Sequence, residues 1–161
     1  MKNCFLLIIL VALTYGPLKA QFNLVPNPSF EDTLSCPIFP DQLEYAVGWF
    51  SSWNSPDYYN ECDGPNGNQS VPNNPLGFQF AQDGKAYAGL ITYSRNGLNY
   101  REHISCALIS PMQINKKYQI TYFISLGNNY SGLASNNHGI LFSTVEFIAL
   151  SPSPNTLRYN Y

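Results

Sequence analysis

The chain has 161 residues and a formal net charge of −2, and only 11% of its residues are charged. This length suits a single domain that can bury a core of its own. No stretch forms a basic stripe, so the composition excludes nucleic acid as an expected partner.

Residues 1–20 have the pattern of a cleavable secretory signal peptide. A charged start at Lys2 precedes an apolar run over residues 5–13, and Ala20 places a small side chain just before the expected cut at Gln21. The run is about half as long as the ~20 residues that a membrane-spanning helix needs. The mature chain is therefore expected to be exported and to contain no transmembrane segment.

Export permits disulfides, and the mature chain keeps Cys36, Cys62 and Cys106. Cys36 and Cys62 lie in loop-like sequence rich in Pro, Gly and Asn, whereas Cys106 lies in an apolar run. The sequence therefore favours a Cys36–Cys62 bridge and a buried free thiol at Cys106. Two loop cysteines can also hold a metal, but the histidine partners and paired spacings of a zinc site are missing.

Aromatic residues make up 15% of the chain and favour pleated sheet, while the abundant Asn and Gly supply turns. Residues 51–78 indicate a long loop that its aromatic residues and Cys62 keep ordered. Short strands with turns between them predict an all-β fold, an antiparallel β-sandwich or jelly roll over residues 21–150, with an irregular or truncated tail over 151–161. The expected strands are 22–25, 47–50, 85–93, 100–108, 118–126 and 139–143.

Several short motifs follow one another in a familiar order: Asn23–Glu31 (NLVPNPSFE), Trp49–Phe50, Ser55–Cys62 (SPDYYNEC), Val71–Asn74 (VPNN), Gly84–Gly89 (GKAYAG) and Asn99–Glu102 (NYRE). This order resembles the N-terminal module of Bacteroidetes-type cell-surface proteins, which often precedes an OmpA-like domain or a C-terminal sorting domain. The resemblance implies a place in the periplasm, on the outer-membrane surface or outside the cell.

The opening Asn-Pro-Ser-Phe-Glu also resembles the first strand of galactose-binding-like jelly rolls. In that class the opening glutamate, here Glu31, often helps to hold a structural calcium ion together with a carboxylate from the last strand. Calcium takes several oxygen ligands at once, and carbonyls near Asn27 and Ser29 would add to the set. The Asp-rich last strand is absent from this sequence, and the alternative is that Glu31 is a surface carboxylate after a turn. No other cofactor is expected.

The loop between Trp49 and Phe78 could bind a glycan or a cell-wall polysaccharide. Aromatic rings present flat apolar surface against which a sugar can stack, and neighbouring polar groups can bond its hydroxyls. The alternative is that Trp49 and Phe50 belong to the core and the tyrosines pin the loop. The candidate ligand-binding residues are Trp53, Asp57, Tyr58, Tyr59 and Asn60, with Glu61 beside them.

Arg101, Glu102 and His103 could suggest catalysis, but strand alternation puts Glu102 on the opposite face from the other two. No nucleophile elbow and no His-Glu-x-x-His motif occurs, so the chain is not expected to be an enzyme. The sequence predicts an exported, non-catalytic cell-surface module that binds carbohydrate. The alternative is a purely structural or adhesive module of a larger outer-membrane or secreted protein.

Overall fold

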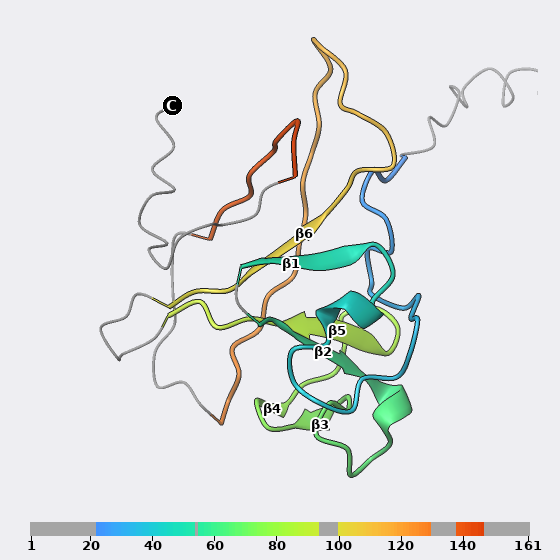
Figure 1. Cartoon of the computed structure of the whole chain (residues 1–161), viewed down its shortest axis with the longest axis vertical. Helices are drawn as coiled ribbons and strands as arrows, with labels where there is room; N and C mark the ends of the chain where they lie inside the picture. Colours follow the sequence, from blue (N-terminus) through green and yellow to red (C-terminus); the bar gives the residue numbers. More distant parts are fainter. Residues whose placement is uncertain (1–21, 54, 94–99, 130–137, 147–161) are drawn as a thin grey trace, which may run out of the picture.

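The computed structural model describes residues 22–53, 55–93, 100–129 and 138–146, so the expected signal peptide and the tail over 151–161 lie outside the described residues. The regular elements within them are short strands and single turns of 3-10 helix (Figure 1). They are η1 (Leu43–Tyr45), β1 (Trp49–Trp53), β2 (Asp57–Asn60), η2 (Glu61–Asp63), β3 (Asn73–Asn74), β4 (Gly77–Phe78), β5 (Ala86–Gly89) and β6 (His103–Cys106).

The strands pair antiparallel in three two-stranded sheets, β1 with β6, β2 with β5 and β3 with β4. The antiparallel β class predicted from composition is therefore confirmed at this level. The described residues do not assemble these pairs into a sandwich or a jelly roll. Neither the 22–25 segment nor the 118–126 and 139–143 segments form a ladder, although each alternates or is apolar in sequence.

The 118–126 segment shows why alternation alone was misleading. Among the described residues it has no hydrogen-bonded neighbour strand, and large side chains at successive positions are exposed, including Tyr122, Phe123 and Ile124. A strand needs a partner for its backbone groups, and sequence alternation records only which side chains are apolar. Ser125 Oγ of this segment donates a 2.6 Å hydrogen bond to Gln79 Oε1.

The β2–β5 pair contains the centre of the buried core. Tyr58 is 0% exposed and packs with Ala46 and Ala86, while Phe30 and Trp49 lie against this group. The Phe30 and Trp49 rings stack with their centroids 4.7 Å apart. This packing of the partly buried Trp49 fits the alternative in which it belongs to the core.

The turn after Pro26 holds the N-terminal loop against the core. The Asn27 amide donates to the carbonyl oxygens of Asp32 and Val47, and its oxygen accepts from the Asp32 N–H. Asn27 has a φ of 41°, a conformation that Asn tolerates better than most residues. Trp49 Nε1 then donates to the Asn27 carbonyl at 2.9 Å, which ties the turn to β1.

A disulfide joins Cys36 to Cys62 across 26 positions of sequence, and these are the two cysteines that the sequence favoured. It links the N-terminal loop to η2, the turn directly after β2. Cys106 is a free, partly buried thiol on β6, and burial raises its pKa. A raised pKa keeps the thiol protonated and therefore unreactive.

Replacing Cys36 and Cys62 together by Ser should lower the free energy of unfolding by about 3.5 kcal/mol, because the unfolded chain then loses a loop constraint of this length. Urea unfolding followed by tryptophan fluorescence measures the difference. Cys106→Ser is the control and should keep the response to reductant. Equal unfolding free energies with and without the bridge would contradict its stabilising role.

Candidate functional site

The structure places the predicted sugar-stacking tyrosines in the interior. Tyr58, Tyr59 and Asn60 on β2 are all buried, so neither ring presents a free face to a ligand. Three consecutive buried residues mean that β2 is covered on both faces, unlike a half-exposed strand. The reading in which these tyrosines pin the loop is the one that the structure supports. Trp53 ends β1 opposite His103, and its side chain lies outside the described part.

A chain of hydrogen bonds runs through these buried groups. The Tyr58 hydroxyl donates to the Phe30 carbonyl at 2.8 Å and accepts from Asn60 Nδ2 at 2.8 Å. Asn60 Oδ1 in turn accepts from the Cys62 N–H at 2.9 Å and caps η2. We call this series from Phe30 to Cys62 the Tyr58–Asn60 relay. It satisfies polar groups that would otherwise be costly to bury.

Asp57, the remaining predicted polar ligand, also has structural bonds. Its two carboxylate oxygens accept from the Asp41 N–H and from the Tyr59 hydroxyl, each at 3.0 Å. Burial raises the pKa of Tyr59, and the Asp57 carboxylate raises it further. The Tyr59 hydroxyl therefore stays protonated and remains a donor to Asp57.

An open hollow of about 650 Å³ lies on the outer side of η2, over the end of the relay. Its walls come from the stretch between β2 and β3 and from Lys85, just before β5. Apolar atoms form the larger share of its lining, and amide, carboxylate, hydroxyl and ammonium groups form the rest; we call it the polar hollow after these groups. Its lining residues are Asn60, Glu61, Cys62, Gly64, Pro65, Ser70, Val71, Pro72, Asn73 and Lys85.

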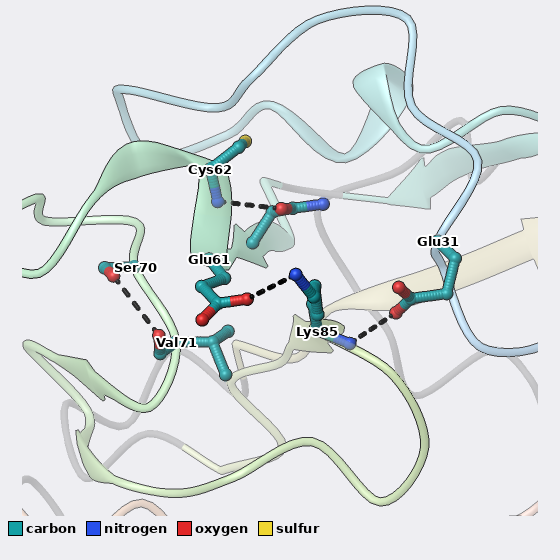
Figure 2. A network of polar contacts seen from close by, with 7 residues as sticks. Glu31, Glu61, Cys62, Ser70, Val71 and Lys85 are labelled. Atoms are coloured by element: carbon teal, nitrogen blue, oxygen red, sulfur yellow. Dashed lines mark hydrogen bonds and ion pairs between the residues drawn. The ribbon is translucent and has the colours of Figure 1, made fainter.

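Glu61 and Lys85 form an ion pair at the hollow, with a distance of 3.1 Å between Oε2 and Nζ (Figure 2). Both side chains are exposed, so the pair adds little to stability and both groups can exchange partners at low cost. Lys85 is fixed at its backbone, where its N–H donates to Glu31 Oε1 at 2.7 Å and its carbonyl accepts from the Glu61 N–H at 3.0 Å. The lysine head group is thus placed at the hollow while its charge remains available.

Glu31, the predicted calcium ligand, accepts the hydrogen bond from the Lys85 N–H. Gly84 makes the approach possible, because a Cβ at this position would overlap the Glu31 carboxylate. Among the described residues, His, Cys, Asp and Glu side chains do not gather in groups of three or more that could hold a metal ion. Calcium binding through Glu31 with carbonyl oxygens stays a prediction.

Asn73 of the β3–β4 hairpin lines the hollow, and the buried Asn74 beside it anchors the hairpin. The buried Asn74 amide donates to the Ser70 carbonyl and to the Tyr87 hydroxyl, while its oxygen accepts from the Leu76 N–H at 3.0 Å. Gly77, with φ of 135°, leaves room for Asn128, which a Cβ would approach to 3.1 Å. These contacts hold the hairpin in a fixed position beside the hollow.

Glu102 lies apart from the hollow as a buried carboxylate that is 6% exposed. Its Oε2 accepts from the Ile91 N–H at 2.7 Å, and its Oε1 accepts from the Tyr100 hydroxyl at 3.1 Å. Its own N–H donates to the Ile91 carbonyl at 2.8 Å, so one residue bonds both backbone groups of Ile91. Burial raises the Glu102 pKa, and nearby Asp57 and Asp41 add to the effect. Glu102 therefore has a structural role, because it holds the chain at Ile91 and Tyr100 in place.

Its neighbours Arg101 and His103 are half-buried where Glu102 is buried, the contrast that strand alternation predicts. Burial lowers the pKa of His103, and the Arg101 charge lowers it further, so neutral imidazole is favoured. Glu102 forms hydrogen bonds with Ile91 and Tyr100. Within the described residues, no carboxylate bonds the His103 ring. No hydrolytic triad is formed by the described residues of this strand.

The residues of the polar hollow were largely missed by sequence reasoning. Glu61 was noted as a neighbour of the aromatic loop, but Ser70, Asn73 and Lys85 were not connected with it. The turn chemistry of Gly64, Pro65 and Pro72 indicated only an irregular loop. Nothing local in the sequence shows that Lys85 returns beside Glu61, because that contact depends on the pairing of β5 with β2.

Comparison with known proteins adds no relative: no family model matches the chain, and neither a curated protein nor a solved structure matches it. In the part of the chain that the structure describes, no helix has the length and apolar character needed to cross a membrane.

Replacing Tyr58 by Phe should cost about 1–3 kcal/mol of unfolding free energy, because Asn60 Nδ2 and the Phe30 carbonyl lose their shared partner in the interior. Tyr122→Phe, on an exposed side chain, is the matched control and should change stability by less than about 0.5 kcal/mol. Chemical unfolding measures both. Equal effects of the two substitutions would show that the relay contributes nothing.

Glu102 should make stability depend on pH in a defined direction. Because its pKa is raised in the folded state above the ordinary value of 4.5, folding favours proton uptake. The contribution is complete below the unfolded pKa and is lost as the pH rises through the folded pKa. Glu102→Gln should therefore flatten the fall in unfolding free energy above pH 4.5, whereas the exposed control Glu44→Gln should keep it. Urea unfolding across this range provides the measurement, and an unchanged slope in Glu102→Gln would refute the assignment.

Proposed function

We propose that this chain is an exported, non-catalytic cell-surface module that binds a carbohydrate in the polar hollow. The observation that carries the proposal is the lining itself: an open volume of about 650 Å³ where the Glu61, Asn73 and Lys85 side chains lie beside Pro and Val side chains. A sugar presents hydroxyls to such polar groups and C–H surface to the apolar ones. Binding sites commonly combine a few placed polar groups with apolar walls in this way.

The charged pair makes the hollow suitable for exchangeable polar contacts. Glu61 can accept from sugar hydroxyls and Lys85 can donate to them, each giving up an exposed ion pair of small value. Asn73 adds an exposed amide that can donate and accept. The Cys36–Cys62 bridge and the Tyr58–Asn60 relay hold η2 beneath these groups, which reduces the ordering cost of binding.

A binding role fits the hollow better than turnover does. Glycoside hydrolysis generally needs two carboxyl groups on opposite sides of the scissile bond. Among the described lining residues Glu61 is the one carboxylate, and it lies against Lys85. The disulfide supports the exported setting, because such bridges persist in oxidising compartments. The place of action within this proposal is the periplasm, the outer-membrane surface or the exterior.

A structural role in a larger outer-membrane or secreted protein is the second candidate. The observation in its favour is the extended 118–126 segment, whose large apolar side chains are exposed within the described residues. Contiguous exposed apolar surface commonly marks an interaction site. If this role is the whole function, the chain should bind no glycan at the polar hollow.

A glycan array that includes bacterial cell-wall polysaccharides tests the leading proposal. Lys85→Ala and Asn73→Ala should each weaken binding by about tenfold, since each removes one or more hydrogen bonds to the sugar. Lys85→Ala keeps the backbone N–H that Glu31 accepts, so the fold should be unaffected. Lys116→Ala is the matched control outside the hollow and should bind as the unchanged chain does. Absence of binding, or binding that ignores both hollow variants, would refute the proposal.

A further inference from the structure

Two exposed aromatic side chains lie on the hairpin that contributes Asn73 to the polar hollow. Phe78 and Phe80 are 58% and 65% exposed, and their rings meet edge to face with centroids 5.2 Å apart. We call this pair the aromatic platform. Large apolar rings are costly to leave in water, and two that gather beside a polar cavity suggest a ligand with an apolar face.

The register of the β3–β4 hairpin places the platform next to the hollow. Phe78 is the cross-strand partner of Asn73, which lines the hollow. Directly opposed residues of an antiparallel pair project from the same face with their Cβ atoms about 5 Å apart. Both side chains are on the exposed face, while Asn74 and Gly77 occupy the buried one. Phe78 therefore stands at the rim that Asn73 forms.

The intervening Gln79 fixes the platform to the wall of the hollow. Its N–H donates to the carbonyl of Pro72, a lining residue, at 2.8 Å. Its side-chain amide donates to the Phe80 carbonyl at 2.9 Å, and its oxygen accepts from Ser125 Oγ at 2.6 Å. The backbone of both rings is thus held, so little further order is lost when a ligand settles on them.

We infer that the platform and the hollow form one elongated binding surface for a β-1,4-linked chain of pyranose units. This inference rests on the proposed function. Pyranoses whose hydroxyls are equatorial have apolar C–H faces that suit the ring faces, and their rims carry the hydroxyls that suit Glu61, Asn73 and Lys85. One sugar would occupy the hollow, and the next unit would stack on an exposed face of one of the two perpendicular rings, beside the edge of the other.

The inference is tested by comparing sugar length. Calorimetry is carried out with chitotetraose, cellotetraose and xylotetraose and with their monosaccharides. At least one tetrasaccharide should bind about tenfold or more tightly than its monosaccharide, the effect expected from burying an exposed ring. Phe78→Ala and Phe80→Ala should remove this advantage, whereas Phe78→Tyr and Phe80→Tyr should keep it.

Phe22→Ala, at a similarly exposed phenylalanine, is the matched control and should leave the length advantage intact. Unfolding midpoints of all variants should agree, because neither ring of the platform is in the core. Binding without a length advantage, or an advantage that survives Phe78→Ala and Phe80→Ala, would overturn the inference. A dimer in sedimentation experiments that the Phe80→Ala substitution dissociates would also overturn it, because a second copy of the chain would then cover the rings.

The result also separates this inference from the proposed function. If the array finds glycans that depend on Lys85 and Asn73 but none of the tetrasaccharides uses the platform, only the elongated surface is lost. If no glycan binds through the hollow, both fall.

Discussion

The hydroxyl of Tyr58 is the contact on which the rest of the described structure depends. It is buried, and it joins the N-terminal loop at Phe30 to Asn60 on β2. Asn60 accepts a hydrogen bond from the Cys62 N–H in η2, and the disulfide joins Cys62 to Cys36 in the N-terminal loop. A covalent bond and a buried hydrogen-bond series thus close one ring around the core. With such short strands, pairing alone would leave these loops weakly fixed.

This ring determines what is left at the surface for a ligand. The polar side chains of β2 already bond to one another and to the backbone. The polar groups that can bond a ligand therefore lie after β2 in the chain, at Glu61 and in the β3–β4 hairpin. The backbone of Lys85 is brought to the same place by the pairing of β5 with β2. The polar hollow therefore lies over η2, which the disulfide and the relay hold in place, and the aromatic platform lies beside it on the β3–β4 hairpin. The sugar chain that we propose as ligand would meet polar groups in the hollow and an exposed aromatic ring beside it.

The sequence predicted the features that depend on local chemistry. The turn after Pro26, strand formation at Ala86–Gly89 and His103–Cys106, the core position of Trp49 and the Cys36–Cys62 pairing could all be inferred from neighbouring residues. It did not predict β2, because a strand buried on both faces has no alternation and its tyrosines resemble exposed ones until their hydroxyl partners are known. The hollow was missed for a related reason. Its residues lie in separate stretches, and only the strand register brings them together.

The most direct test of the central claim is to map where a sugar binds. Amide nitrogen–proton correlation spectra of the chain from Gln21 to Tyr161 would be recorded during titration with chitotetraose, cellotetraose and xylotetraose. The account predicts saturable shifts at Glu61, Asn73 and Lys85 and at the neighbouring Phe78 and Phe80, with the Tyr58 amide nearly unchanged. Shifts that gather elsewhere on the chain, or spectra that no sugar alters, would contradict it.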